Sequence, residues 1–421
     1  MKNLRSIIML SSVLFSFTIA QHAARDNENA LSRLQRITQQ SEPEKINKAI
    51  AKTLLGLLTP GQWFPQGVNG AIDVTGNRFV HVAARNGDDN ALHTLSLLGA
   101  DFKQYDYAGR APIHLAAAAA QKKAIMYLIT HGASLDDQCA DGTGVLDAML
   151  IGERFDPALF ERSVTEVNAN FINRDDGKTP LVVAAHVGNR LALQALLVSK
   201  LVTDINHQDV IGNSALHYAC YDLGLNAPWM ALQLLVAGAK PHLLNERKQT
   251  PLHFACFDPV DGTGVHRKYL VIQRLQELNA NPHAEDDQGS TPLHNAAMTG
   301  NELVVDQLLS KGVTVEPQEA GGVTPLHLAC AQGHVAVARL LLAKGAQVNS
   351  KTVHKHTPLH FAANETMKPE MVRFLVEECK ADVNALDDKG KKPSQLAHSD
   401  DVIDFLKSHE TAQPEKPLAK L

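Results

Sequence analysis

One block of about 33 residues recurs along most of this chain and restricts the possible fold more than any other feature. Residues 322–349 show it in full: Gly-Val-Thr-Pro-Leu-His-Leu-Ala-Cys-Ala-Gln-Gly-His, then a second apolar segment that stops at Gly345. Pro325 suits the first turn of a helix, where its missing N–H would have no partner, and Thr324 is expected to cap that helix by accepting from its free N–H groups. Apolar residues at helical spacing in both segments predict two short antiparallel helices joined to an extended loop.

The blocks follow one another at intervals of 33 to 41 residues. Most begin with a glycine that is expected to need a positive φ in a turn. The starting residues are Gly76, Gly109, Gly142, Gly177, Gly212, Lys248, Gly289, Gly322 and Lys355, with a truncated tenth block at Gly390. The third block is the weakest, because residues 144–147 read Gly-Val-Leu-Asp and its second helix is poorly defined between Asp156 and Val164.

This block resembles the ankyrin repeat, whose signature contains Thr-Pro-Leu-His-x-Ala at a period of 33 residues. Residues 250–255, 291–296, 324–329 and 357–362 match every fixed position of that signature. The resemblance implies an all-α fold with short β-hairpin loops, an ankyrin-repeat solenoid of nine to ten helix-turn-helix repeats with a helical N-terminal cap. In such a stack each repeat buries its apolar face against its neighbours, and terminal repeats are polar on the outside.

The sequence outside the repeats predicts three further segments. Residues 1–23 read as a secretory signal peptide, with Lys2 and Arg5 before a diluted apolar run; an uncleaved membrane anchor is the alternative. Residues 24–75 carry two amphipathic patterns and predict a helical cap, or else a separate docking element. Residues 76–409 form the predicted repeat domain, and 410–421 a disordered tail.

Composition and motifs favour binding over catalysis. A formal charge of −5 and a pI near 6.5 argue against general nucleic-acid binding. The chain has no G-x-S-x-G and no H-E-x-x-H, and we expect no catalytic residues, no cofactor and no small-molecule substrate. His354 and His356 in one loop are a weak metal candidate, and we expect no metal site.

Histidine and cysteine recur at fixed repeat positions. In ankyrin proteins, which these units resemble, the signature histidine bonds backbone at the turn and locks neighbouring repeats; its positions here are His81, His114, His217, His253, His294, His327 and His360. Cys220, Cys256 and Cys330 share a core-facing position at a spacing too wide for disulfides, so we interpret them as small buried apolar residues.

A stack of this kind presents a concave face built from hairpin tips and first helices. The candidate partner-binding residues at the tips are Tyr105, Tyr107, Arg174, His207, Arg247, Lys248, His354 and Lys355. An insertion at residues 258–268 falls between the helices of the sixth repeat and is either a binding loop or neutral drift. Recurring Asn206, Asn349 and Asn384 are interpreted as turn-forming residues.

The predicted function is non-covalent binding of another protein, as a scaffold and, given the signal sequence, in an exported, periplasmic or secreted setting. The nearest analogy is a bacterial ankyrin protein exported as an effector, an inference at the level of fold alone. The alternatives are an envelope accessory protein that supports an enzyme or assembly of its own cell, and an enzyme with a site formed by residues 24–75 and repeat loops. A membrane-anchored scaffold requires that the apolar run at residues 7–20 is not cleaved.

Overall fold

The computed structural model describes residues 69–71, 74–152, 154–221, 224, 226–257, 268–365 and 369–410. The predicted signal peptide, nearly all of the predicted cap, residues 258–267 of the insertion and residues 411–421 lie outside this part of the chain. None of the helices in the described ranges is both long enough and apolar enough to span a bilayer.

The chain divides into two units. Unit 1 comprises residues up to 183 together with 191–203, and unit 2 comprises residues 184–190 together with those from 204 onward. The helices of unit 1 are α4 (Phe79–Asn86), α5 (Asp89–Leu97), α6 (Pro112–Ala118), α7 (Lys122–Thr130), α8 (Val145–Ile151), α9 (Pro157–Ser163), the 3₁₀ turn η1 (Asn168–Asn170) and most of α11 (Arg190–Ser199), while α10 (Pro180–His186) crosses the division.

Unit 2 continues the same alternation of helices. Its elements are α12 (Ala215–Tyr221), α13 (Ala227–Val236), α14 (Pro251–Cys256), α15 (Tyr269–Glu277), α16 (Pro292–Thr299), α17 (Glu302–Ser310), α18 (Pro325–Ala331), α19 (Val335–Ala343), α20 (Pro358–Glu365), α21 (Pro369–Arg373), η2 (Phe374–Glu378), η3 (Pro393–Gln395) and α22 (Asp400–Glu410). The predicted tail began at residue 410, but Glu410 belongs to the last helix. Its carboxylate pairs with Lys392 at 3.0 Å.

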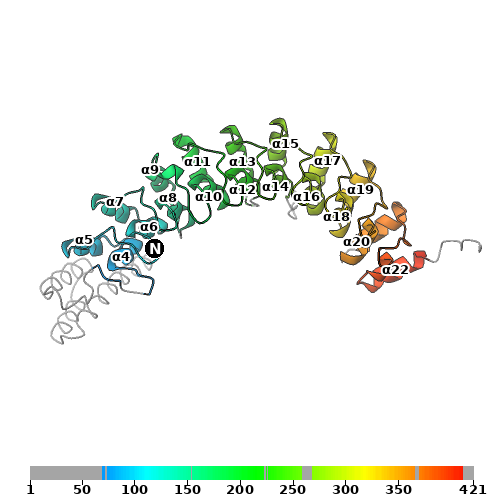
Figure 1. The fold of residues 1–421 in the computed structure, drawn as a ribbon, viewed down its shortest axis with the longest axis horizontal. Coiled ribbons are helices and arrows are strands. Elements are labelled where there is room, and N and C mark those ends of the chain that lie inside the picture. Colours follow the sequence, from blue (N-terminus) through cyan, green and yellow to red (C-terminus); the bar gives the residue numbers. More distant parts are fainter. Residues whose placement is uncertain are drawn as a thin grey trace, which may run out of the picture. The chain divides into compact units, whose positions relative to one another are not determined.

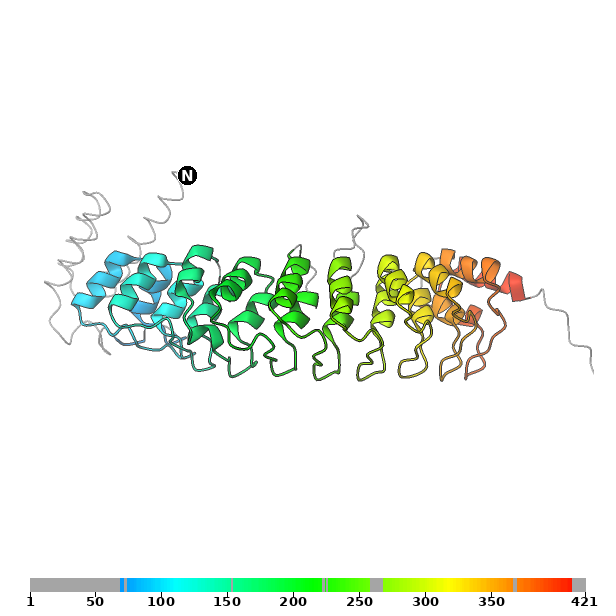
Figure 2. The same ribbon diagram turned by 90° about the horizontal axis from the view of Figure 1, so that it is seen from above.

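Each unit is a stack of helix pairs in sequence order. In unit 2 the first helices of successive repeats, α12, α14, α16, α18 and α20, form one row and the second helices, α13, α15, α17 and α19, another (Figure 1). Figure 2 shows the connecting loops of unit 2 projecting on one side of these rows. Only isolated bridges, such as Gln208 with Ser214, mark the hairpins, so the described residues contain no extended strand.

The core of each repeat follows from its signature. Leu326, Ala329 and Cys330 on α18 are buried, as are the equivalent residues of α12, α14 and α16. Small alanine and cysteine side chains let consecutive first helices approach closely. All five cysteines are free, and burial raises the thiol pKa of Cys139 and Cys220 to about 12, as expected for apolar packing residues.

The signature histidines link each repeat to the next, as the resemblance implies. His327 shows the pattern: Nδ1 accepts from the backbone N–H of Thr324 at 3.2 Å, and Nε2 donates to the carbonyl of His356 in the next repeat at 3.2 Å. Thr324 is the N-cap residue of α18, as predicted, and its hydroxyl lies 2.9 Å from the same Nδ1. The same contacts recur at His81, His114, His217, His253, His294 and His360.

Hairpin tips also bond to one another. The N–H of Val353 donates to the carbonyl of Gly321 at 2.8 Å, and that of Asp388 donates to the carbonyl of His354 at 3.0 Å. Asn206 and Asn349 extend this connection, because their side-chain oxygens accept from backbone N–H groups one repeat later, at Lys240 and Asp382. The prediction that these asparagines form local turns therefore misses their main role, which is to join repeats.

The third repeat is better formed than its sequence indicates. A helix, α9, covers residues 157–163, where the sequence predicts only a poorly defined one, and the Asp156 side chain caps it by accepting from the N–H of Leu159. Asp147 takes the place of the signature histidine. Its Oδ2 accepts from Gly144 N–H at 3.1 Å, while its buried Oδ1 has no partner.

Candidate functional site

A groove runs across the fifth to seventh repeats of unit 2, on the side of the first helices. We call it the aromatic groove; its volume is about 650 Å³. Its walls come from the exposed sides of α12, α14 and α16 and from the hairpins before α12 and α14. The residues that line it are Ile211, Asn213, His217, Tyr218, Tyr221, Asn245, Glu246, Arg247, Gln249, His253, Phe254, Phe257, Asn295 and Met298.

Aromatic residues at outward-facing positions of the first helices place their rings in this groove. Tyr218 and Phe254 occupy the variable position after the signature histidine, and Tyr221 lies three residues beyond Tyr218 on α12. The rings of Tyr221 and Phe254 meet edge to face, with centroids 5.7 Å apart, yet Tyr221 remains 52% exposed. An exposed tyrosine on a packed aromatic neighbour is typical of a protein-binding surface.

Polar groups at the rim of the groove are fixed by the fold. The Tyr218 hydroxyl donates to Asp209 Oδ2 at 2.6 Å, and the Asn295 amide donates to the carbonyl of His253 at 3.0 Å. Arg247 is exposed, with its guanidinium 3.9 Å from Asp287. These contacts orient the Tyr218 and Asn295 side chains at the rim, and the Arg247 side chain remains exposed.

The two histidines in the groove do not form a catalytic pair. Burial lowers the pKa of His217 to about 4 and also lowers that of His253. Both ring nitrogens of each residue bond backbone groups, at Ser214 and Gln249 for His217 and at Thr250 and Ser290 for His253. Neither ring has a free nitrogen for proton transfer, so their shifted pKa values reflect their structural role.

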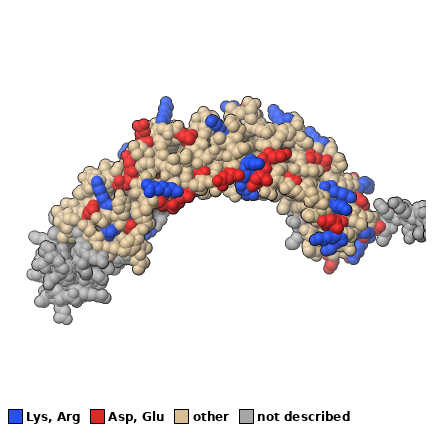
Figure 3. Space-filling model, viewed as in Figure 1, with Lys and Arg blue, Asp and Glu red and all other residues tan. Residues whose placement is uncertain are grey.

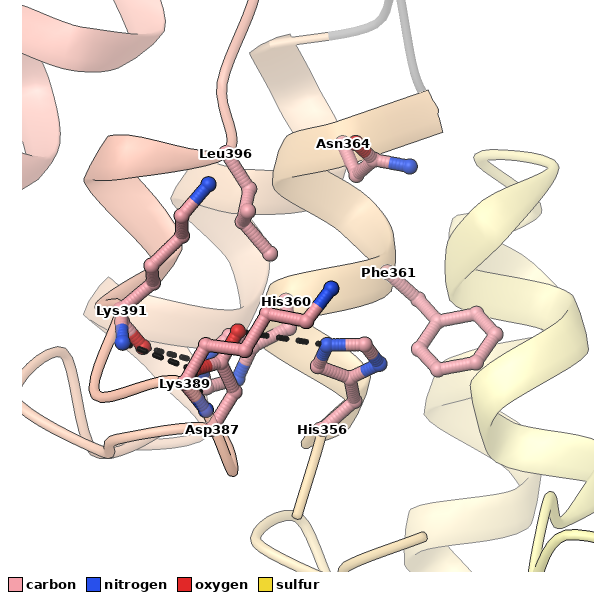
Figure 4. A pocket seen from close by; sticks show the side chains of 8 residues that line it. All are labelled: His356, His360, Phe361, Asn364, Asp387, Lys389, Lys391 and Leu396. Carbon is pink, nitrogen blue, oxygen red and sulfur yellow. Dashed lines mark hydrogen bonds and ion pairs between the residues drawn. The ribbon is translucent and has the colours of Figure 1, made fainter. Parts of the chain in front are cut away.

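A second, smaller cavity lies between the hairpins of the ninth and tenth repeats. We call it the basic pocket; its volume is about 290 Å³ (Figure 4). Asp387 is buried beside it, where its Oδ1 accepts from the N–H groups of Lys389 and Lys391 at 2.8 and 2.7 Å and its Oδ2 lies 3.4 Å from His356 Nε2. Burial alone would raise the Asp387 pKa, but these hydrogen bonds outweigh it and hold the pKa below its usual value.

Acidic hairpins separate the aromatic groove from the basic pocket. Glu285, Asp286 and Asp287 lie at the tip before α16, and Glu319 lies at the tip before α18. Figure 3 shows acidic and basic side chains gathered next to one another along the first-helix side of unit 2. The tips of unit 2 therefore alternate in charge along the stack.

The predicted tip residues fall on both units. Tyr105, Tyr107 and Arg174 are exposed on hairpins of unit 1, where the N–H groups of Tyr107 and Arg174 bond the preceding tip. In unit 2, Arg247 lines the aromatic groove beside Lys248. His207 is half-buried. His354 pairs with Asp388 at 2.8 Å, and Lys355 is exposed.

Unit 1 has a groove of its own, of about 930 Å³, between α4, α6 and the end of α8. Arg85, Arg110 and Arg154 line it, and Arg110 is paired with Asp106 at 2.7 Å. Among the described residues, no cluster of three or more histidine, cysteine, aspartate or glutamate side chains could hold a metal ion.

Comparison with known families identifies the repeat. A model described as ankyrin repeats in three copies matches residues 265–352, and a single ankyrin-repeat model matches residues 354–388. Residues 265–352 and 354–388 are therefore ankyrin repeats. The helix pairs, signature histidines and hairpins described above recur in both units, and ankyrin repeats generally mediate protein–protein interactions.

Curated relatives share part of this chain. Human neurogenic locus notch homolog protein 1 is 30% identical over 185 residues, which are 44% of this chain and 6% of that protein. Inversin of Canis lupus familiaris is 28% identical over 235 residues, 55% of this chain and 21% of that protein. An L-asparaginase of Dirofilaria immitis is 31% identical over 175 residues, 41% of this chain and 28% of that protein. The chain thus spans less than a third of the length of each.

A solved structure is similar to part of the chain. It is the human ASB11 ankyrin repeat domain, which aligns with a TM-score of 0.47 and 26% identity over 56% of this chain and all of that domain.

Of the partner-binding candidates chosen from the sequence, only Arg247 lines either of the two cavities of unit 2 described above. The candidates were the most prominent residues of the tips, whereas the aromatic groove is built by Tyr218, Tyr221 and Phe254 on the first helices. The signal was present in the variable position of the signature, which faces out of the core: the residues are Tyr218, Phe254, Asn295, Leu328 and Phe361.

Proposed function

We propose that this chain binds a partner protein non-covalently through the first helices and hairpins of unit 2, with the aromatic groove as the centre of the contact. The observation that supports this most directly is Tyr221, half-exposed and packed edge to face on Phe254 in a groove of about 650 Å³. Tyrosine offers a large contact area at little entropic cost, and Arg247 adds a charged donor at the rim.

The proposal includes no catalytic step. The most strongly shifted groups in the aromatic groove, His217 and His253, are used in holding repeats together. An enzyme would need groups that converge on one site with a free nucleophile, base or acid. A binding scaffold accounts for the groove without such groups.

The test begins with capture of proteins by the full chain and identification of a direct partner from purified components. Tyr221→Ala is then expected to weaken binding by about tenfold or more, as for a central aromatic contact. The matched control is Tyr269→Ala, the same truncation on the second-helix side, where Tyr269 is 37% exposed. Equal affinities for wild type and Tyr221→Ala would place the contact elsewhere and reject the groove.

We further propose that the chain is exported, on the basis of the charged start and apolar run within residues 1–23. An exported effector and an envelope accessory protein then differ only in the partner. Intact mass of the exported product tests cleavage near residue 23, and cell fractionation distinguishes release from retention. A product found uncleaved in the cytoplasm would contradict the proposal.

A further inference from the structure

The basic pocket has more positive charge than the fold itself uses. Residues 351–356 and 387–391 contain four lysines, Lys351, Lys355, Lys389 and Lys391, and two aspartates. In the described part of the chain none of these lysines forms an ion pair, whereas both aspartates are already engaged: Asp388 with His354, and Asp387 with backbone N–H groups and His356.

Two of these lysines, Lys389 and Lys391, line the pocket together with the apolar side chains of Phe361 and Leu396. Figure 4 shows the Lys389 side chain extending from its loop toward His356, and that of Lys391 extending toward Leu396. Phe361 lines the pocket from α20, and the exposed Asn364 adds an amide at its edge. Two lysines and one aspartate line the cavity, which leaves it with a net positive charge.

Asp387 shapes this cavity and offsets only one of the two lysine charges that line it. Its carboxylate is buried, and its Oδ1 accepts from the backbone N–H groups of both Lys389 and Lys391. The same contacts fix the loop that carries both lysines, so that their side chains leave it near one another. The two ammonium groups remain available to an external anion.

On this basis we propose that the basic pocket binds a glutamate- or aspartate-rich segment of the partner protein. The proposal rests on the proposed function, since it names the chemistry of one part of that partner. A carboxylate in the pocket accepts from Lys389 and Lys391, and the methylene groups of its side chain cover Phe361 and Leu396. Glu285, Asp286, Asp287 and Glu319 on nearby tips of unit 2 would repel a long polyanion, which favours a protein segment of limited length over nucleic acid.

The test uses the full chain and a fluorescent twelve-residue peptide in which about half of the residues are glutamate. Binding is followed by fluorescence anisotropy at low and at high salt. We expect saturable binding that salt weakens and that the double variant Lys389→Gln/Lys391→Gln weakens by roughly three- to tenfold. The matched control, Lys311→Gln/Lys407→Gln, removes the same charge from exposed lysines that do not line the pocket and is expected to bind like wild type.

Competing occupants are tested in the same assay. Inorganic phosphate or a single-stranded oligonucleotide that binds this pocket while the acidic peptide does not would overturn the inference. So would equal losses in the double variant and its control, because the effect would then be one of net charge alone.

Failure of this inference can be distinguished from failure of the proposed function. If the purified partner binds the Lys389→Gln/Lys391→Gln variant like wild type but loses affinity for Tyr221→Ala, the aromatic groove is retained and the acidic-segment inference is wrong. If both variants bind the partner like wild type, both proposals are wrong.

Discussion

The signature histidines join repeats only as neutral rings, because Nδ1 must accept a hydrogen bond while Nε2 donates one. A second proton on Nδ1 would break the contact with the N-cap backbone. Burial accordingly lowers the pKa of His217, His294 and His327 to about 4, against an unfolded value near 6.5.

The stability of unit 2 should therefore fall as the pH decreases from about 6.5 toward 4. In that window these histidines bind protons in the unfolded chain but stay neutral in the folded one. Each ring therefore lowers the free energy of unfolding by up to about 1.4 kcal/mol for each pH unit of acidification. Above about pH 6.5 the rings are neutral in both states, and their stabilising contribution to the fold is fully present. Denaturant unfolding between pH 7 and pH 5, before most carboxylates titrate, measures the slope.

A double variant, His294→Gln/His327→Gln, provides the comparison for that slope. It should be less stable than wild type at pH 7 but lose less stability on acidification, since two of the titrating rings are gone. Parallel pH profiles for the two proteins would mean that these rings do not govern the acid sensitivity.

Asp147 offers the opposite case in unit 1. Burial raises its pKa to about 7, and its Oδ1 has no hydrogen-bond partner. Asp147→His should restore the missing link to the carbonyl of Lys178 and raise the unfolding free energy by about 1–2 kcal/mol at neutral pH. Thermal melting measures the gain. Asp147→Asn is the control, because it removes the charge without reaching the next repeat; an equal gain there would attribute the effect to charge alone.

Hairpin tips need a left-handed residue at one position, and not every repeat supplies glycine there. Gly322 has a φ of 73°, while Lys355 and Lys248 adopt 58° and 57° at the equivalent position. A side chain with Cβ in this region costs about 1–2 kcal/mol, partly offset by the greater freedom of glycine in the unfolded chain.

Lys355→Gly should therefore stabilise unit 2 by about 0.5–1 kcal/mol, as measured by denaturant unfolding. The control is Lys355→Ala, which removes the charge but keeps Cβ and should give no gain. Stabilisation by alanine equal to that by glycine would show that loss of charge, and not relief of the backbone, is responsible.

The helices of the fold were largely predictable, because local sequence features mark them in each repeat. These features are a proline at the first turn, an apolar face of leucine and alanine, and a glycine at the turn that follows. What could not be predicted depends on the neighbouring repeat. The Asn206 and Asn349 side chains reach backbone groups more than thirty residues away, and the aromatic groove forms only when α12 and α14 lie next to each other. The apolar pattern of residues 157–163 is weak, so the sequence predicted a poorly defined helix there. The N-cap hydrogen bond of Asp156 compensates for that weak pattern and α9 forms.

At the scale of the stack, stability comes from contacts between consecutive repeats. In unit 2 each first helix packs on the next, from α12 through α14, α16 and α18 to α20, and histidine and hairpin bonds follow the same order. Such a stack behaves as a row of nearest-neighbour interactions, so damage to one repeat should spread first to the repeats that touch it.

Leu326→Asp tests this directly, because Leu326 on α18 is 1% exposed and an aspartate there would bury a charge without a partner. We expect a loss of about 4 kcal/mol or more, with hydrogen exchange rising first in α16, α18 and α20 and later in α12. Leu328→Asp is the matched control on the same helix, since Leu328 is only half-buried and its aspartate would remain hydrated. An exchange increase of equal size in every helix of unit 2 would indicate a single cooperative core, and unchanged melting of Leu326→Asp would contradict the assignment of this helix to the interface between repeats.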